Sequence, residues 1–111
     1  KNIIKIFINN WKVAKSIADE YNIKFLPILQ PSAFSSKSNL DYINLDLDLK
    51  IQFNKVYDMI KKELNNNNLK YLNLEDSLDK NELYFIDFFH VSPNGNYEIA
   101  KKIINSKLFS Q

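Results

Sequence analysis

The chain has 111 residues, enough for one small domain, and its composition excludes several classes of function. A single glycine and the absence of cysteine exclude a dinucleotide-binding fingerprint, a P-loop, disulfides and thiolate metal sites. The formal net charge is only +2 and all basic residues are lysine, which argues against nucleic acid as a partner because arginine is the usual bidentate reader of guanine and phosphate. One histidine and no apolar run of transmembrane length lead us to expect no metal, no cofactor and no membrane span in this segment.

The first third of the sequence predicts a helix followed by a short strand. Apolar residues recur at steps of three and four across residues 4–21, which is typical of one helix face, and Asn22 suits a left-handed C-cap. Residues 23–29 (IKFLPIL) form a dense apolar run of strand length, in which Pro27 lacks a backbone donor and therefore favours an edge position or a bulge. The serine-rich residues 32–44 are loop-like, and we expect their first part to be an ordinary solvated connection rather than a mobile loop beside a substrate.

A second helix and a second strand are predicted in the middle of the chain. The helix begins near Asp46, although its start is open by several residues because 45–49 (LDLDL) alternates like a strand. Its predicted inward face carries Leu49, Phe53, Val56, Ile60 and Leu64. Four asparagines at 65–68 end this helix, 70–74 (KYLNL) is the second short strand, and 75–82 is an acidic loop.

The last helix has the strongest start signal in the sequence. Ser92 is suited to the N-cap and Pro93 to the first helical position, where its missing N–H is not needed. The buried stripe of this helix is predicted at Tyr97, Ala100, Ile103, Ile104 and Leu108.

The order helix, strand, helix, strand, helix predicts an α/β fold with a parallel sheet. Parallel strands are normally covered on both faces and have more than two members, so two short strands are too few for a complete sheet. The chain also begins at Lys1 rather than at methionine. We therefore expect residues 1–111 to be a single partial domain, the C-terminal part of a larger α/β domain whose N-terminal portion is missing.

Asp87 and His90 are the residues most suited to chemistry. A histidine near its ordinary pKa can accept a proton from a hydroxyl nucleophile, and a carboxylate that holds its Nδ1–H fixes the tautomer and stabilises the imidazolium. Three residues apart on a non-helical segment, the two side chains can converge at the carboxyl edge of the sheet, where open α/β sheets bind ligands. The alternative is a partly buried histidine bonded to a chance carboxylate.

The motif D-x-x-H-x-S-P-x-G-x-x-x-I-A resembles the C-terminal block of the SGNH (GDSL-type) hydrolase and acyltransferase superfamily. The residues that carry the resemblance are Asp87, His90, Gly95, Ile99 and Ala100. The order of predicted elements upstream also fits, although only the D-x-x-H block is specific. The resemblance implies a flavodoxin-like, three-layer parallel-sheet fold, with histidine as general base and aspartate as its orienter. It also implies a small ester or an acylated glycan as substrate, without a cofactor.

The resemblance is incomplete in one important respect. In that superfamily the serine nucleophile lies in an earlier block, and a glycine and an asparagine in middle blocks complete the oxyanion hole. No serine here follows a glycine at a predicted strand end, and Gly95 is the only glycine. Because loss of a triad member usually costs several orders of magnitude in rate, we expect these residues alone to be inactive.

Weaker candidates and alternatives complete the interpretation. Gln30 follows the first predicted strand and is a weak candidate for lining a substrate cleft; a polar strand end before a rigid turn is the simpler explanation. The main competing function is a non-catalytic α/β module for binding or assembly, which predicts that His90 is packed against apolar neighbours. A receiver-like domain is disfavoured because the predicted strand ends are not acidic. The compartment stays open, with an extracytoplasmic location compatible with the resemblance.

Overall fold

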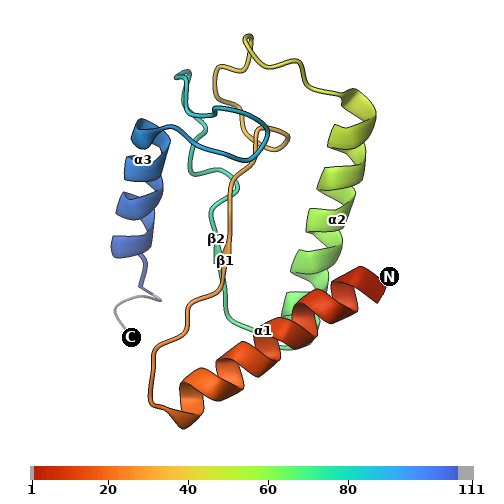
Figure 1. Cartoon of the computed structure of the whole chain (residues 1–111), viewed down its shortest axis with the longest axis vertical. Helices are drawn as coiled ribbons and strands as arrows, with labels where there is room; N and C mark the ends of the chain where they lie inside the picture. The colour runs from red at the N-terminus through yellow and green to blue at the C-terminus, as the bar shows by residue number, and fades with distance from the viewer. Residues whose placement is uncertain (1, 108–111) are drawn as a thin grey trace.

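The computed structural model describes residues 2–107, which form a mixed α/β structure with three helices and a two-stranded parallel sheet. The order of elements agrees with the sequence-based prediction (Figure 1). The elements are α1 (Asn2–Glu20), β1 (Ile28–Leu29), α2 (Leu47–Asn66), β2 (Leu72–Asn73) and α3 (Pro93–Ile104). No helix among the described residues has both the length and the hydrophobicity needed to cross a bilayer.

The ends of the helices are set by the capping residues that the sequence predicts. Asp46 caps α2 by accepting a hydrogen bond from the Leu49 amide at 2.9 Å, which resolves the open start of this helix. Ser92 caps α3 in the same way, through the Gly95 amide at 3.2 Å. Asn22, after α1, has a φ of 54°, the left-handed conformation expected of a C-cap.

The inward faces of the helices differ from the prediction. In α2 the buried residues are Tyr57, Ile60 and Leu64, whereas Leu49 and Val56 are exposed. In α3 only Gly95 is buried among the described residues, and Tyr97 is 62 % exposed. Tyr21, expected on the inward face of α1, is also exposed. These predictions were wrong because periodicity shows that a face is apolar but not whether another element covers it.

Three other positions of the buried stripe predicted for α3 are also not buried. Ala100 and Ile104 are exposed and Ile103 is half-buried. Leu108 lies outside the described residues. The prediction of a buried stripe along α3 is therefore wrong where the structure tests it.

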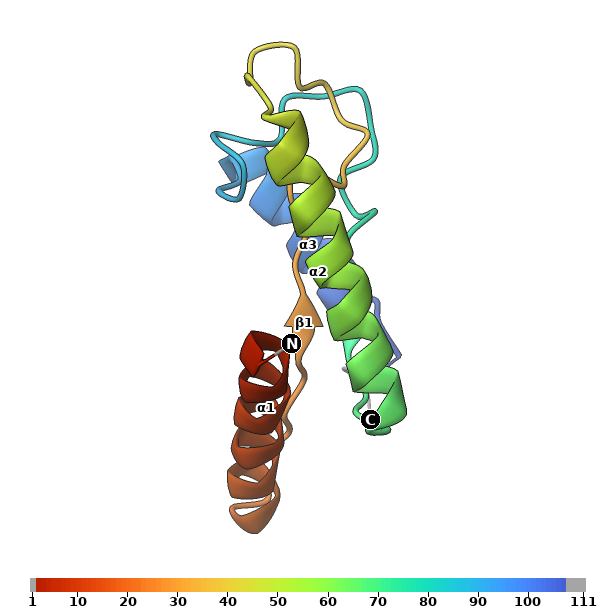
Figure 2. The same cartoon turned by 90° about the vertical axis from the view of Figure 1, so that its right-hand side faces the viewer.

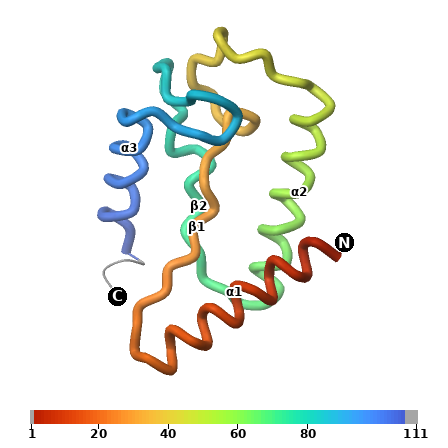
Figure 3. The backbone as a smooth tube through the Cα atoms, viewed as in Figure 1, coloured from red at the N-terminus to blue at the C-terminus, as the bar shows by residue number. Residues whose placement is uncertain are grey.

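The two strands are parallel and shorter than predicted. Ile28 pairs with Leu72 and Leu29 with Asn73, and the tube in Figure 3 shows both strands running in the same direction. The ladder is extended by the Leu72 amide, which donates to the Pro27 carbonyl at 2.9 Å. Among the described residues, each strand has one edge without a strand partner. Pro27 lies just before β1, and the rest of the 23–29 run is also outside the strand.

The buried residues form two separate groups. The first, between α1, α2 and β1, contains Ile4, Ile8, Leu29, Tyr57, Ile60 and Leu64. The second lies under the loops at the carboxyl ends of the strands and contains Ala33, Leu78, Tyr84 and Phe85. The loop after β1 belongs to this second group: Ser32, Ala33 and Phe34 are almost completely buried. The expectation of a solvated connection there is wrong because its apolar side chains pack on the segment that carries Asp87 and His90.

The molecule is thin and less compact than its length would allow. Its extents are 45 × 33 × 17 Å and its radius of gyration is 15.2 Å, compared with about 13 Å for a compact domain of this size. Figure 1 shows the strands between α2 and α3. Figures 1 and 2 show α1 at the end of the molecule remote from the start of α3. Ile3, Ile6, Val13 and Ile17 form an exposed apolar face on α1. Two strands alone do not make the three-layer sheet that the resemblance implies.

Candidate active site

The segment with Asp87 and His90 lies at the carboxyl ends of both strands. β1 and β2 run toward the end of the molecule where the loops after each strand meet, and α3 begins there (Figures 1 and 3). This is the edge at which open α/β sheets bind ligands. The position agrees with the sequence-based expectation.

A short closed loop holds the two residues in place. Phe85 and Val91 form an isolated antiparallel bridge, and the Ile86 amide donates to the His90 carbonyl at 2.8 Å. Just outside this bridge, the Ser92 amide donates to the Tyr84 carbonyl at 2.7 Å. The loop 86–90 is therefore closed at its base, and its last residue leads directly into the cap of α3.

Asp87 uses both of its carboxylate oxygens within this loop. Oδ1 accepts from the Phe89 amide at 2.9 Å and from the His90 amide at 2.8 Å. Oδ2 lies 2.7 Å from Nδ1 of His90. The backbone hydrogen bonds from His90 and Phe89, followed by the imidazole bond, lower the pKa of Asp87 from 3.8 to about 2. The carboxylate is therefore ionised at neutral pH and fixed in orientation.

His90 is oriented by Asp87 and remains open to solvent. Its side chain is 78 % exposed, and no hydrogen bond to its Nε2 is present among the described residues. A carboxylate on Nδ1 favours the tautomer with a proton on Nδ1, which leaves Nε2 free to accept another. The predicted contact between Asp87 and His90 is thus confirmed. The packed histidine predicted for a non-catalytic module is not observed.

Aromatic side chains from two other elements support the loop. Phe34, after β1, stacks on Phe88 with ring centroids 5.1 Å apart and meets Phe89 edge-on at 5.7 Å. Phe53 of α2 contacts the Phe89 ring at 5.3 Å. The Ala33 amide also donates to the Phe88 carbonyl at 2.9 Å. Phe88 and Phe89, the two residues before His90, are therefore anchored to the loop after β1 and to α2.

Tyr42 supports the base of the same loop. Its hydroxyl donates to the Phe85 carbonyl at 2.6 Å and accepts from the Phe85 amide at 3.2 Å. Sequence reasoning missed both Tyr42 and Phe34. The one available signal was a phenylalanine inside a serine-rich segment, where an apolar ring needs a buried contact.

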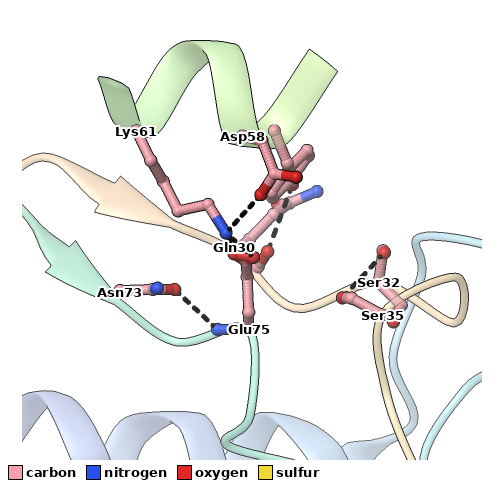
Figure 4. A network of polar contacts seen from close by, with 8 residues as sticks. Gln30, Ser32, Ser35, Asp58, Lys61, Asn73 and Glu75 are labelled. Carbon is pink, nitrogen blue, oxygen red and sulfur yellow. Dashed lines mark hydrogen bonds and ion pairs between the residues drawn. The ribbon is translucent and has the colours of Figure 1, made fainter. Parts of the chain in front are cut away.

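Gln30 lies apart from this pair. Its backbone carbonyl accepts from the Tyr57 hydroxyl at 3.1 Å (Figure 4). None of the hydrogen bonds within residues 2–107 joins Gln30 to Asp87 or His90. Its role in a substrate cleft stays a prediction.

The serines near the site have structural roles. Ser92 caps α3, and its hydroxyl is 3.4 Å from the Leu83 carbonyl. Ser32 is buried and its hydroxyl lies 3.2 Å from that of Ser35. In the described part of the chain no serine is hydrogen-bonded to the imidazole, and no group of three or more carboxylate, histidine or cysteine residues is placed to hold a metal ion. The site thus contains an exposed histidine bonded to a carboxylate, and no serine is hydrogen-bonded to the imidazole among the described residues.

The chain matches no protein-family model, and no curated protein or solved structure matches it. The interpretation of the site therefore depends on its motif and its geometry.

Proposed function

We propose that this chain is the Asp–His-bearing part of a serine acyl-hydrolase or O-acyltransferase of the SGNH type. The observation that carries the proposal is the 2.7 Å contact between Asp87 and Nδ1 of an exposed His90, at the carboxyl edge of a parallel sheet. In this proposal the described residues are the C-terminal part of a flavodoxin-like, three-layer domain. The serine nucleophile and the oxyanion donors belong to an N-terminal portion outside these 111 residues.

The geometry suits general-base catalysis. Nε2 of His90 would take the proton of the serine hydroxyl while its Oγ attacks the ester carbonyl, and would then give that proton to the leaving alcohol. In the second half of the reaction the imidazole would activate water, or the hydroxyl of an acceptor such as a glycan. Asp87 would remain ionised throughout and stabilise the imidazolium, because the hydrogen bonds from the Phe89 and His90 amides hold it in place independently of the imidazole.

The exposed apolar surfaces also support the proposal. A two-stranded parallel sheet is normally too small to be stable by itself, and both strands here have an edge without a strand partner among the described residues. Further strands of the same domain would pair with these edges and pack against the apolar face of α1.

Ester hydrolysis by the whole protein that contains this chain tests the proposal. We expect turnover of p-nitrophenyl acetate that falls by at least about 10³-fold in His90→Gln and in Asp87→Asn. Asn96→Ala is the matched control, because Asn96 is exposed on the first turns of α3 and makes no side-chain contact with the pair. Ester turnover that His90→Gln leaves intact would overturn the catalytic role.

A serine-directed fluorophosphonate provides an independent measurement. The proposal predicts covalent labelling of one serine outside residues 1–111, located by peptide mass spectrometry and slowed by His90→Gln. Labelling of Ser32, Ser35 or Ser92 would show that the nucleophile lies within this chain and would refute the division of the triad.

The alternative function, a non-catalytic binding or assembly module, is favoured by one observation. The apolar face of α1, formed by Ile3, Ile6, Val13 and Ile17, is exposed and would suit an assembly contact. A whole protein that neither hydrolyses esters nor reacts with the fluorophosphonate would support this alternative.

A further inference from the structure

A polar hollow lies beside the candidate active site. It has a volume of about 440 Å³ and separates the N-terminal half of α2 from the loop that follows β1. Its polar lining includes Ser35, Ser36, Lys37, Lys50, Asn54 and Lys61. A volume of this size is within the range of small-molecule sites. Figure 4 shows part of this region, with Lys61 and Asp58 extending from α2 toward Glu75 at the end of β2.

The carboxylates in this hollow are already paired. Nζ of Lys61 lies 3.0 Å from Oδ1 of Asp58, 2.9 Å from Oε1 of Glu75 and 3.1 Å from Oε2 of Glu75. The Glu75 side chain is only 16 % exposed, so this pair forms the inner wall. One ammonium group is therefore shared between two acidic side chains.

Two other ammonium groups remain available. Among the described residues, neither Lys37 nor Lys50 has a hydrogen bond or an ion pair from its side chain. The three lysines and two carboxylates of the lining sum to a net charge of +1. The lining groups that have no internal hydrogen bond among the described residues are thus mainly donors, from Lys37, Lys50 and Asn54.

We infer that this hollow binds the oxyanion group, carboxylate or phosphate, of a small molecule. Lysine ammonium and asparagine amide groups are suitable donors for such oxygens, and the hollow lies at the carboxyl ends of the strands, where α/β sheets bind ligands. Phe34 lines the hollow and also contacts Phe88 and Phe89, the two residues before His90. If the proposed function holds, this anionic group belongs to the ester substrate. Binding itself does not depend on that function.

Isothermal titration calorimetry with inorganic phosphate and, separately, with acetate tests the inference. The whole protein is titrated at low ionic strength, since salt screens exposed charges. We expect saturable binding of at least one anion, and a Kd at least about tenfold higher in Lys50→Gln and in Lys37→Gln. Lys5→Gln is the matched control because it removes the same charge from an exposed helical position on α1 outside the hollow; its Kd should change less than twofold, because Lys5 does not line the hollow.

The outcomes separate this inference from the proposed function. The anion that saturates identifies the group as a phosphate or a carboxylate. The absence of saturable binding by both anions, or an equal loss in Lys5→Gln, overturns the inference. Saturable anion binding by a whole protein whose unsubstituted form shows no ester turnover supports the hollow and refutes only the proposed function.

Discussion

Gly95 offers the sharpest test of how the candidate site is built. It is a buried glycine inside α3 with an ordinary negative φ, so its backbone conformation does not require glycine. What it provides is space: a Cβ at this position would lie 3.0 Å from the Tyr84 carbonyl oxygen and 3.0 Å from Cβ of Val91. Ordinary contacts between such atoms are about 3.5–4.0 Å. Both neighbours belong to the segments that close the loop around Asp87 and His90.

The two effects of Gly95→Ala oppose each other. Replacing a helical glycine by alanine is worth up to about 1 kcal/mol in helix propensity, whereas overpacking costs about 1–3 kcal/mol. The Tyr84 carbonyl cannot move freely because it accepts from the Ser92 amide at 2.7 Å, and Val91 is paired with Phe85. We therefore expect Gly95→Ala to lower the free energy of unfolding by about 1 kcal/mol, near the middle of the net range.

Urea unfolding followed by far-UV circular dichroism measures this change. Asn96→Ala is the control, since it adds helix propensity at the neighbouring exposed position and should raise the free energy of unfolding by about 0.5 kcal/mol. The reasoning is refuted if Gly95→Ala is as stable as Asn96→Ala or more so. That result would mean that the loop around Asp87 and His90 accommodates the added Cβ without a loss in the free energy of unfolding.

Three further predictions concern the contacts around the site. Lowering the pH should leave the Asp87–His90 contact intact until the carboxylate is protonated: its pKa is depressed, so the stability it contributes is complete above pH 3.8 and is lost as the pH falls through about 2. The imidazole chemical shifts of His90, the only histidine, report this step, and a transition centred near pH 4 would contradict it. Tyr42→Phe removes a hydroxyl that both donates to and accepts from Phe85, and should cost about 1–2 kcal/mol of unfolding free energy with faster amide hydrogen exchange at Phe85. Tyr97→Phe, at an exposed ring, is its control, and equal effects of the two variants would exclude a specific role for Tyr42. Glu75→Gln should lower the pKa of Tyr57, which burial and then the Glu75 carboxylate raise from 10.0 to about 12, without returning it to 10.0 because burial is the larger cause. The stability linked to Tyr57 is present below pH 10 and is lost as the pH rises through about 12, so Glu75→Gln should move that loss to lower pH. NMR of ring-labelled tyrosine measures the pKa of Tyr57. An unchanged pKa would show that Glu75 has no influence on it.

The features that the sequence predicted correctly are those decided within a few residues. The capping side chains Asp46 and Ser92 locate the starts of α2 and α3, and the contact between Asp87 and His90 follows from their spacing on a loop. The features that it missed are decided by distant partners. Burial of Phe34 depends on rings contributed by α2 and by the loop before α3, and nothing in the local residues 32–38 specifies those neighbours.

The inward faces of the helices show the same distinction. Val56 is as apolar as Ile60, yet only Ile60 is buried, because the orientation of α2 is set by its contacts with α1 and β1. In α3 the periodic stripe exists in the sequence, but the described residues do not cover most of it. Hydrophobic periodicity therefore predicts the presence of a helix more reliably than it predicts which face of that helix is buried.

The closed loop around Asp87 also has a kinetic consequence. The hydrogen bonds between this carboxylate and His90 connect residues at most three positions apart, and the contacts that close the loop at its base connect residues at most eight positions apart. Closing so short a segment takes on the order of 10–100 ns, far less than the pairing of strands that are remote in sequence. Asp87 and His90 can thus adopt their relative geometry before β1 and β2 meet. Later folding steps then only have to place an already assembled pair at the edge of the sheet.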